Sequence, residues 1–589
     1  MTVASTPDSG RPREPVAAGG RGRGRGRVVM LVDNAVNGDS RVQKAARSMA
    51  DAGWDVVLLG QSPDRDRHRW TIGDAEVQLV PVVMTLAKRR RDYRRVVLPR
   101  LFAYRRGGIA HHRKQWVKAW RADLLARRSA EGRRFLIRRT AARILARWVG
   151  FRHRQLALVE GRRNPDSLPE RLRTAMWRAL LGDRCWRRLE PYLWDYEFAF
   201  GPVVDALEPD LIHANDFRMI GVGARAVHRA RGRGRSVKLV WDAHEYLPGI
   251  KPRAGYRRWM PAHVAHEREY GRCADAVVTV SQTLAELLHK EHRLSRMPVV
   301  VLNAPGGGPP AERAHEPVPD LRELCGVDAA TPLLVYSGAL APQRGLATLI
   351  EALPHLPGAH AALIVPAPEG WVVRKVLEHA AELGVADRVH PLPYVPHWQI
   401  VPFLATADIG VIPIHHWPNH ELALITKFME YAHARLPIVV SDVRTMAEKV
   451  RETGQGEVFR AEDTADFVRA ARDVLADPAA YRAAYDRPGL LAQWTWEAQA
   501  DILDGVYRTL LAAPAEATVA ATVPLDGAVV GNRAMGETGV GETAVGETAS
   551  GRGPLPAGES PPGGGRKPGG RPGPGEETEP GDPAGATAN

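Results

Sequence analysis

Short apolar runs alternate with amphipathic helical segments along two long blocks of this 589-residue chain. Strands that alternate with helices form parallel sheets covered on both faces by those helices. A Gly/Pro-rich stretch at 304–319 separates the blocks and is typical of a linker. The pattern predicts an α/β fold with two Rossmann-like domains whose parallel sheets face each other across a cleft. The predicted strands are 27–32, 54–60, 210–214, 237–243, 275–281 and 298–304 in the first block, and 332–338, 361–366, 388–392, 408–414 and 437–442 in the second.

Changes in composition set the expected domain boundaries. The Gly/Arg-rich start and the Gly/Pro/Ala/Glu/Thr-rich end contain too few apolar residues to offset the entropy lost on ordering, so we expect both to be disordered. The expected order is a basic leader (1–26), a first domain (27–305) with a basic helical insertion (88–190), a linker (306–319), a second domain (320–485), a C-terminal helix (486–512) and a tail (513–589).

Composition argues against several classes of protein. No run of 18 or more apolar residues is present, so we expect no membrane-spanning helix. The three cysteines, Cys185, Cys273 and Cys325, form no C-x-x-C pair, which argues against a disulfide framework and indicates a reducing compartment. The basic leader lacks the apolar core of a signal peptide. These features predict a cytoplasmic protein.

Positive charge is concentrated in the insertion. Residues 88–190 contain 31 lysine and arginine residues against 8 acidic ones, although the whole chain carries only +14. Aromatic and aliphatic residues are interleaved with the arginines at helical spacing, which suits an anionic membrane surface, where each basic residue adds about 1 kcal/mol. A solvated helix face is the simpler explanation. Specific nucleic-acid binding is less favoured, because no recognition motif accompanies the charge. We expect a peripheral protein at the inner face of the plasma membrane.

The loop after the first strand of the second block has features of a phosphate site. In "YSGALAPQRGLATLI" (336–350), Gly338 permits a turn after the strand, and Arg344 and Gly345 precede a helix. Free backbone amides at a helix start and a guanidinium both suit a diphosphate. An ordinary strand-to-helix turn with a surface arginine is the alternative.

A second helix start in the same block has a similar character. Thr426 is the expected N-cap of a helix in which Lys427 and Glu430, at i and i+3, share one face. The amides and the ammonium suit an anion. The Glu430 carboxylate has two oxygens that can accept hydrogen bonds from a ribose diol. A weak surface ion pair between Lys427 and Glu430 is the alternative.

Several short motifs, in this order and spacing, resemble those of one family. They are "LVDNAVNGDSRVQKAARSMADAGWDV", "DLIHANDF", "WDAHEYLP", "ADAVVTVSQTLAELL", "VVLNAP", "YSGALAPQRGLATLIEAL" and "NHELALITKFMEYAHARLPIVVSD". Over residues 27–512 the chain resembles the family 4 retaining glycosyltransferases of bacteria, which have the GT-B fold. The resemblance implies that the C-terminal helix crosses back onto the first domain.

For the second domain, the resemblance implies a site for the sugar donor. Glu430 matches the carboxylate that grips the donor ribose, and Lys427 lies in the helix start that faces the diphosphate. Arg344, in the Arg-Gly pair with Gly345, matches the basic residue that contacts the donor phosphates. The family needs no metal, because helix starts and basic side chains replace the cation.

For the first domain, the resemblance implies a cleft wall near the transferred sugar. His244 in "WDAHE" matches the histidine that lines this wall, and Gly38 and Asp39 lie in a loop that approaches donor and acceptor. His213 is expected either as a ligand contact or as a structural histidine with satisfied hydrogen bonds. Neighbouring Asp216 and Glu245 are expected as loop caps.

The chain departs from the family pattern at two positions. Many members have a glutamate eight positions before the one equivalent to Glu430, but this chain has Leu422 there and Glu421 one position earlier. Asn419, Glu421 or backbone amides would then bind the sugar hydroxyls. Ala339 stands where many members have an arginine, which would remove a basic contact to the phosphates.

The sequence therefore predicts a hexosyltransferase-like enzyme. It would transfer a sugar from a UDP-, GDP- or other nucleotide-diphosphate donor to an acceptor hydroxyl with retention of configuration, in the synthesis of cell-surface glycans or glycolipids. The acceptor would be a glycan, a lipid-linked molecule or a small molecule, and no cofactor or metal would be needed. A nucleotide-sugar epimerase or hydrolase on the same scaffold, and a non-catalytic scaffold protein, are the alternatives.

Overall fold

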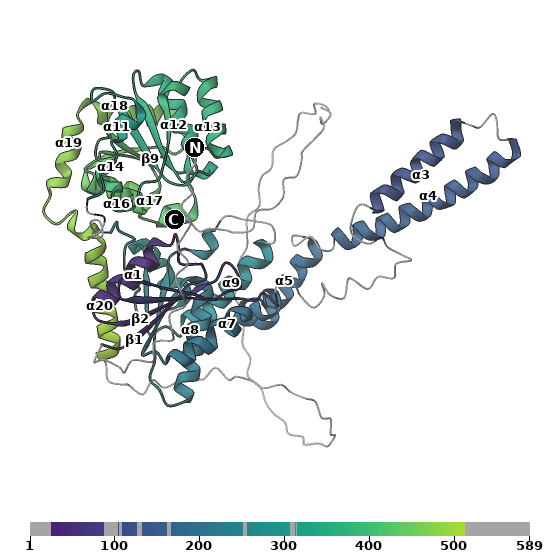
Figure 1. The fold of residues 1–589 in the computed structure, drawn as a ribbon, viewed down its shortest axis with the longest axis horizontal. Helices are drawn as coiled ribbons and strands as arrows, with labels where there is room; N and C mark the ends of the chain where they lie inside the picture. The colour runs from purple at the N-terminus through teal and green to yellow at the C-terminus, as the bar shows by residue number, and fades with distance from the viewer. Residues whose placement is uncertain are drawn as a thin grey trace, which may run out of the picture. The chain divides into compact units, whose positions relative to one another are not determined.

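The computed structural model describes residues 25–86, 104, 109–126, 132–161, 167–250, 256–306, 313 and 315–512 (Figure 1). All of these residues fall within one compact unit. Most of the expected leader, half of the expected linker, the whole expected tail and parts of the basic insertion lie outside the described residues. Within the described part of the chain, no helix is both long enough and apolar enough to cross a membrane.

The first block folds as an eight-stranded sheet with the order β3-β4-β2-β1-β5-β6-β7-β8. Every neighbouring pair is parallel except β3 and β4, which are antiparallel. The expectation of purely parallel strands is therefore wrong at this edge, where Gly73 takes a left-handed conformation (φ 57°) that allows a tight hairpin. The strands are β1 (Arg27–Leu31), β2 (Asp55–Gln61), β3 (His68–Ile72), β4 (Ala75–Val80), β5 (Leu211–Asn215), β6 (Lys238–Ala243), β7 (Ala276–Thr279) and β8 (Val299–Val300).

The second block folds as a six-stranded, fully parallel sheet with the order β11-β10-β9-β12-β13-β14. Its last strand, β14, was not anticipated from the sequence. Together the two sheets confirm the prediction of two parallel-sheet domains. The strands are β9 (Leu333–Ser337), β10 (His360–Val365), β11 (Val389–Pro393), β12 (Ile409–Ile412), β13 (Ile438–Ser441) and β14 (Gly456–Phe459).

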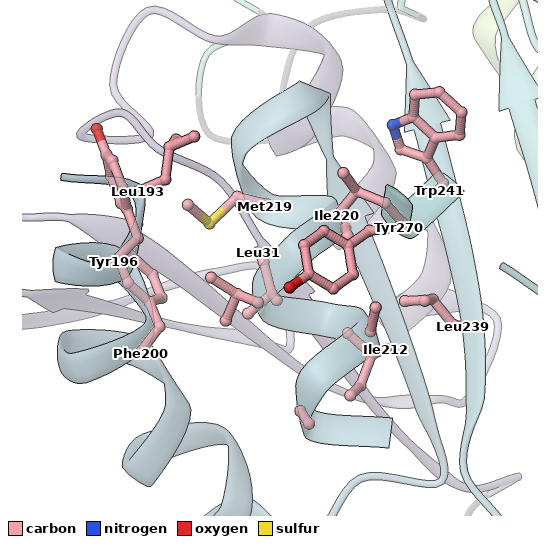
Figure 2. Packing of buried hydrophobic residues seen from close by; sticks show 14 of the residues in the cluster. Leu31, Leu193, Tyr196, Phe200, Ile212, Met219, Ile220, Leu239, Trp241 and Tyr270 are labelled. Atoms are coloured by element: carbon pink, nitrogen blue, oxygen red, sulfur yellow. The ribbon is translucent and has the colours of Figure 1, made fainter. Parts of the chain in front are cut away.

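Helices cover both faces of the first sheet. Successive strand side chains point to opposite faces. Val29 and Leu31 accordingly pack with α7, α8 and α9, whereas Val28 and Met30 pack with α1 and α20. Figure 2 shows part of the α7–α9 side, with Met219 from α8 among the buried residues. The helices are α1 (Ser40–Asp51), α7 (Leu193–Leu207), α8 (Asp216–Gly232), α9 (Tyr256–Gly271), α10 (Gln282–His292) and α20 (Trp496–Ala512).

Helices also cover both faces of the second sheet. One core contains residues of α14, α16 and α17, and the other contains residues of α12, α13 and α18. The last helix of the chain, α20, belongs to the core of the first sheet rather than to either of these. The helices of this half are α11 (Leu321–Cys325), α12 (Leu346–Ala352), α13 (Trp371–Glu382), α14 (Ile400–Leu404), α15 (Pro418–Leu422), α16 (Thr426–His433), α17 (Arg444–Thr453), α18 (Thr464–Ala476) and α19 (Pro478–Arg482).

The described part of the basic insertion is helical. Helices α3 (Ile109–Ala126) and α4 (Gly132–Gly161) pack against each other as an antiparallel pair (Figure 1). They are followed by α5 (Leu168–Leu181) and the short α6 (Trp186–Leu189). Trp186 and Leu189 of α6 are buried in the core of the first sheet, so the insertion is anchored there.

Candidate functional site

Glu430 lies in the second turn of α16, the helix that follows β12 and α15. Its Oε2 atom is buried and accepts no hydrogen bond from any residue that the structure describes. A buried polar atom left without a partner costs about 1–3 kcal/mol, so such atoms are rare and usually have a functional reason. Lys427 does not satisfy this oxygen, and the alternative of a Lys427–Glu430 surface ion pair is not what the structure shows.

The start of α16 differs from the expected cap. Thr426 is the first helical residue, and Ile425 precedes it at the N-cap without a side-chain hydrogen bond. The Thr426 hydroxyl donates to the carbonyl oxygen of Asn303 at 3.0 Å. The prediction of a Thr426 N-cap is therefore wrong, because Thr426 is already part of the helix and its hydroxyl donates to the segment that joins the two halves. The first amides of α16 receive no bond from a capping side chain.

The loop after β9 places Arg344 immediately before α12. Arg344 ends a short 3-10 turn, and Gly345 is the N-cap residue with φ 70°. A Cβ atom on Gly345 would lie 1.6 Å from the carbonyl oxygen of Pro413, which follows β12. Gly345 thus brings the loops after β9 and β12 into contact. Gly338 has a nearly extended backbone, and the Tyr336 hydroxyl donates to the carbonyl of the following residue, Ala339, at 2.8 Å.

Tyr394 lies close enough to both Glu430 and Arg344 to be affected by their charges, and it was not identified from the sequence. Partial burial raises the pKa of its phenol, Glu430 raises that pKa further, and Arg344 opposes the rise. Glu430 and Arg344 therefore both act on the same ring. The available signal was an aromatic residue two positions after the predicted strand 388–392, at the carboxyl edge where ligands of parallel sheets bind.

Asn419 and Glu421 of α15 are engaged by protein groups. The Asn419 Oδ1 atom accepts the backbone N–H of Tyr246 at 3.1 Å. Glu421 accepts the backbone N–H of Arg444 at 2.7 Å, at the start of α17, and contacts His416 Nδ1 at 2.6 Å. In this structure both side chains hold loops in place, which is a role that the sequence did not predict for them.

A second cluster of polar groups, the Asp242 cluster, lies at the carboxyl ends of β5 and β6. Asp242 is buried and forms a two-point ion pair with Arg41 of α1, in which both N–O distances are 3.0 Å. His244 Nε2 lies 3.2 Å from an Asp242 oxygen, and His213 Nε2 lies 3.4 Å from the same oxygen. Both predicted histidines therefore lie within ion-pair distance of the Asp242 carboxylate, although neither Nε2 atom forms a well-oriented hydrogen bond with any residue that the structure describes.

The opposite charges in the Asp242 cluster stabilise each other's ionised forms. Burial alone would raise the pKa of Asp242, but Arg41 and the histidines hold it well below its usual value. Burial alone would lower the pKa of His244, but Asp242 and Asp216 outweigh burial and raise it to about 9. The imidazole is therefore positively charged at neutral pH, and each of its two ring nitrogens lies near a carboxyl group.

Asp216 contributes to this cluster from the first turn of α8. Its Oδ1 atom lies 3.4 Å from His244 Nδ1. Burial raises its pKa, and His244 opposes the rise. Its backbone is left-handed (φ 63°), which is unusual for a residue other than glycine and is often found at functional sites. Asp216 is thus more than the simple loop cap that the sequence predicted. Burial also raises the pKa of neighbouring Glu245.

The loop after β1 gives Gly38 and Asp39 structural tasks. Asp39 is the N-cap of α1, and its carboxylate accepts the backbone N–H of Val42 at 3.2 Å and an amide N–H of Asn34 at 2.8 Å. Gly38 is left-handed (φ 89°) and has open space where a Cβ atom would stand. The structure brings neither residue into contact with His244.

Arg41, Asp242 and Lys44 are the other residues that sequence reasoning missed. Arg41 is buried on the apolar face of α1, and a charged residue among such positions is itself a signal. Asp242 stands at the end of an otherwise apolar predicted strand, which is a similar signal. Lys44 donates to Asn303 Oδ1 at 3.1 Å and to the carbonyl oxygen of Ala304. In the described residues, no group of three His, Cys, Asp or Glu side chains is arranged to hold a metal ion.

Two family models match the chain, one in each half. The Glycosyltransferase Family 4 model matches residues 155–304, and the Glycosyl transferases group 1 model matches residues 331–477. Each model covers one sheet with its helices, or part of it.

Relatives and one solved structure agree with this match. The glycogen synthase of Mycobacterium tuberculosis is 30% identical over 177 residues, which is 30% of this chain and 42% of that protein. The D-inositol 3-phosphate glycosyltransferase of Mycolicibacterium gilvum is 26% identical over 305 residues, which is 50% of this chain and 64% of that protein. The chain thus spans less than two thirds of either relative.

The fold comparison covers more of the chain. The structure of sucrose-phosphate synthase from Thermosynechococcus elongatus superposes with a TM-score of 0.52 and 15% identity, over 83% of this chain and 100% of that one. The resemblance expected from the motifs is confirmed: this chain resembles the family 4 glycosyltransferases and has the GT-B fold.

Proposed function

We propose that the protein is a glycosyltransferase that transfers a sugar from a nucleotide-diphosphate donor to an acceptor hydroxyl with retention of configuration. The observation that carries this proposal is the buried Oε2 atom of Glu430, which has no hydrogen-bond partner among the described residues. It lies on a helix whose first amides receive no bond from a capping side chain, and Glu430 and Arg344 both influence the phenol of Tyr394.

The donor would bind along the carboxyl edge of the second sheet. Glu430 would accept hydrogen bonds from the two ribose hydroxyls. Lys427, the first amides of α16 and Arg344 would bind the diphosphate, since each offers positive charge or N–H donors to it. The ring of Tyr394 would stack on the base, because its phenol lies near enough to both Glu430 and Arg344 for each to influence its pKa.

The transfer step needs no protein nucleophile. The bond between the anomeric carbon and the diphosphate oxygen breaks, and its electron pair leaves with the nucleoside diphosphate. The acceptor oxygen bonds to the same face of that carbon, and its proton passes to the departing phosphate oxygen. Arg344 and Lys427 would stabilise the charge that develops on the leaving group. His244, charged and held by Asp242, would orient the sugar hydroxyls from the first domain. No metal is needed in this scheme, because these groups supply the positive charge.

The names of the relatives guide the choice of substrates. Glycogen synthase and D-inositol 3-phosphate glycosyltransferase both point to hydroxyl-rich acceptors. A glycan, a lipid-linked molecule or a small molecule remains the acceptor class, and UDP-, GDP- and other nucleotide-sugars remain the donors to test. We propose a role in the synthesis of cell-surface glycans or glycolipids for an enzyme with such an acceptor.

A screen of nucleotide-sugars against the full chain tests the proposal. Thermal shift identifies the preferred nucleotide, and calorimetric titration with that nucleotide gives its affinity for each variant. Glu430→Gln should weaken binding at least about tenfold, because one hydrogen bond from a hydroxyl to a charged acceptor is lost. Glu378→Gln, which changes an exposed glutamate of α13, is the matched control and should leave the affinity unchanged.

Two outcomes would contradict the proposal. If no nucleotide-sugar stabilises the protein, the donor site is wrong. If Glu430→Gln binds the preferred nucleotide as tightly as the control does, Glu430 does not hold the ribose. Release of free sugar without transfer to any acceptor in a panel would favour a hydrolase, and the anomeric configuration of the product, determined by NMR, tests retention.

A further inference from the structure

Helix α5 of the basic insertion exposes a row of large apolar side chains. Leu168, Leu172, Met176 and Leu180 are 63%, 64%, 45% and 67% exposed. They follow one another at intervals of four residues, so they lie on one side of the helix. Isolated exposed apolar residues are ordinary, but a continuous row of this length marks an interaction surface. We call these four residues the α5 row.

The opposite side of α5 is the one that packs on the protein. Trp177 and Leu181 pack against the core of the first sheet, and Glu170 and Thr174 are buried on the same side. At about 100° per residue, these four positions fall within about 60° of one another and point away from the α5 row. The core therefore accounts for one apolar side of the helix and leaves the α5 row uncovered by any residue that the structure describes.

Arginines border the α5 row on both sides. Arg171 and Arg178 lie along one border and Arg173 lies along the other, by the same helical geometry. An apolar sector between basic borders is the pattern of a helix that lies in the plane of a membrane, with its apolar side chains at the boundary of headgroups and acyl chains. Arginine stems extend along such a boundary and keep the guanidinium at the phosphates.

A hollow beside α5 extends this surface. It has a volume of about 420 Å³ and lies between α5 and α9. Ala175 and Ala179, which continue the exposed side of α5, line it together with Arg178 and Arg268. Asp183 also lines the hollow, and Arg268 is paired with Glu291 at 2.8 Å. The small apolar residues therefore provide room, and Arg178 provides the positive charge, for an anionic headgroup.

The helical pair α3–α4 adds the same two properties. Trp116 of α3 and Leu136, Ile137 and Ile144 of α4 are exposed, although the two helices pack on each other. The surrounding segment 88–190 carries 31 basic and 8 acidic residues. Charge of this density and sign attracts an anionic bilayer surface before any apolar contact forms.

We propose that the basic insertion docks the protein on an anionic lipid bilayer, with the α5 row inserted at the headgroup boundary. This inference goes beyond the proposed function and does not depend on it, since it rests on the surface of the basic insertion and not on the candidate donor site. Nucleic acid is less suited, because its phosphates would engage the arginines but would leave the α5 row in water.

Co-sedimentation of the full chain with vesicles tests the inference. Vesicles of phosphatidylcholine alone are compared with vesicles that also contain about 30% phosphatidylglycerol, an anionic lipid. Wild type should bind the anionic vesicles at least about tenfold more tightly than the neutral ones. The variant Leu172→Gln/Met176→Gln/Leu180→Gln keeps helix-forming side chains and all the charges, and should lose at least about tenfold of that binding.

Controls separate the insertion of the α5 row from general effects. Leu324→Gln makes the same change at an exposed leucine of α11 and should bind like wild type. Circular dichroism and thermal unfolding of the triple variant should match wild type, because the changed side chains are exposed. Its donor binding should also be unchanged, which distinguishes failure here from failure of the proposed function.

Three results would overturn the inference. The first is that wild type binds neutral and anionic vesicles alike, or neither. The second is that the triple variant binds anionic vesicles as wild type does. The third is that light scattering shows an oligomer that dissociates in the triple variant, since a second copy of the chain would then cover the α5 row. Binding to duplex DNA that exceeds binding to anionic vesicles would favour nucleic acid instead.

Discussion

Gly345 shows how one residue fixes the geometry of the candidate donor site. Its left-handed backbone ends the turn that carries Arg344, and the Pro413 carbonyl oxygen occupies the space that a side chain would need. A phosphate-binding arginine is useful only if its loop is held in one position. Here the close approach of two backbones provides that position.

We predict that Gly345→Ala lowers the free energy of unfolding by more than about 2 kcal/mol, because it adds overpacking to the cost of a left-handed backbone. Thermal or urea unfolding measures the loss. Gly454→Ala is the matched control, since Gly454 has a similar φ of 74° but open space at the Cβ position. The control should lose only about 1 kcal/mol. Equal losses in the two variants would show that the contact with Pro413 is not tight.

Asp216 and His244 make a second argument at the scale of residues. His244 has a pKa raised to about 9 in the folded protein, because the pull of Asp242 and Asp216 outweighs burial. A histidine whose folded pKa is raised contributes stability that is fully present below its unfolded pKa of about 6.5. That contribution is lost as the pH rises through about 9.

We predict that Asp216→Asn lowers the pKa of His244 by about one unit or more, since one of two nearby carboxyl groups is removed. Asparagine tolerates the left-handed backbone, so the fold should be kept. NMR titration of histidines labelled in the ring measures the change. Asp183→Asn, at an exposed site far from His244, is a control and should leave the titration unchanged. An unchanged pKa in Asp216→Asn would mean that the two side chains do not interact in solution.

At the scale of elements, α20 links the end of the chain to the Asp242 cluster. The Tyr507 hydroxyl of α20 is hydrogen-bonded to His213 Nδ1, and the other ring nitrogen of His213 faces Asp242. Trp496 and Asp504 of α20 are hydrogen-bonded to residues of the first domain as well. The helix is therefore part of the wall that supports His213.

We predict that Tyr507→Phe lowers the free energy of unfolding by about 1–2 kcal/mol and also shifts the NMR signals of His213 and His244, because His213 loses its partner. Tyr485→Phe removes a similarly buried hydroxyl that donates to the carbonyl oxygen of Leu436, in the second half of the chain. This control should lose similar stability without moving either histidine signal. If Tyr485→Phe moved the signals of His213 and His244 as Tyr507→Phe does, or if neither variant moved them, then Tyr507 of α20 would have no specific effect on the Asp242 cluster.

At the scale of the whole molecule, Lys44 lies where three parts of the chain meet. Lys44 belongs to α1 and donates hydrogen bonds to Asn303 and Ala304, which lie between the two halves. Its Nζ atom lies 4.6 Å from the ring centroid of Trp496, at the start of α20. Its pKa is lowered to about 7, chiefly by burial and then by Arg41, although Glu430 opposes the change. A lysine in this position is half neutral near physiological pH.

We predict a pH-dependent stability from this one group. Between pH 7 and the unfolded pKa of about 10.4, the unfolded state binds more protons at Lys44 than the folded state does. The free energy of unfolding should therefore rise with pH over this range, by roughly 4 kcal/mol at most. The free energy of unfolding is measured for wild type and for Lys44→Met at several pH values. The value for wild type minus the value for Lys44→Met should rise with pH over this range.

Lys290→Met is the matched control for Lys44, because Lys290 is exposed on α10. The difference between wild type and this control should not change with pH. A flat difference for Lys44→Met as well would show that Lys44 is solvated in the protein and that the three parts of the chain do not enclose it.

The sequence by itself determined the two parallel-sheet blocks, because apolar runs at strand length and apolar faces at helical spacing are local patterns. Arg344, Lys427 and Glu430 each come soon after a predicted strand in the sequence. The sequence therefore also predicts that they lie at one edge of the sheet, because the carboxyl ends of parallel strands meet there. The edge hairpin of the first sheet, β3 and β4, and the final strand β14 were missed, because these strands are short and polar residues interrupt their apolar ones.

Only the tertiary structure decided which polar groups meet. Arg41 and Asp242 are 201 positions apart, and Tyr507 and His213 are 294 apart, so no spacing rule connects them. Thr426 illustrates the same limit. Threonine is a residue type that favours the N-cap position, yet here it is the first helical residue, and its hydroxyl donates to the distant carbonyl of Asn303. Local propensity sets where helices and strands form, whereas hydrogen bonds and ion pairs between distant segments depend on which surfaces the packed sheets bring together.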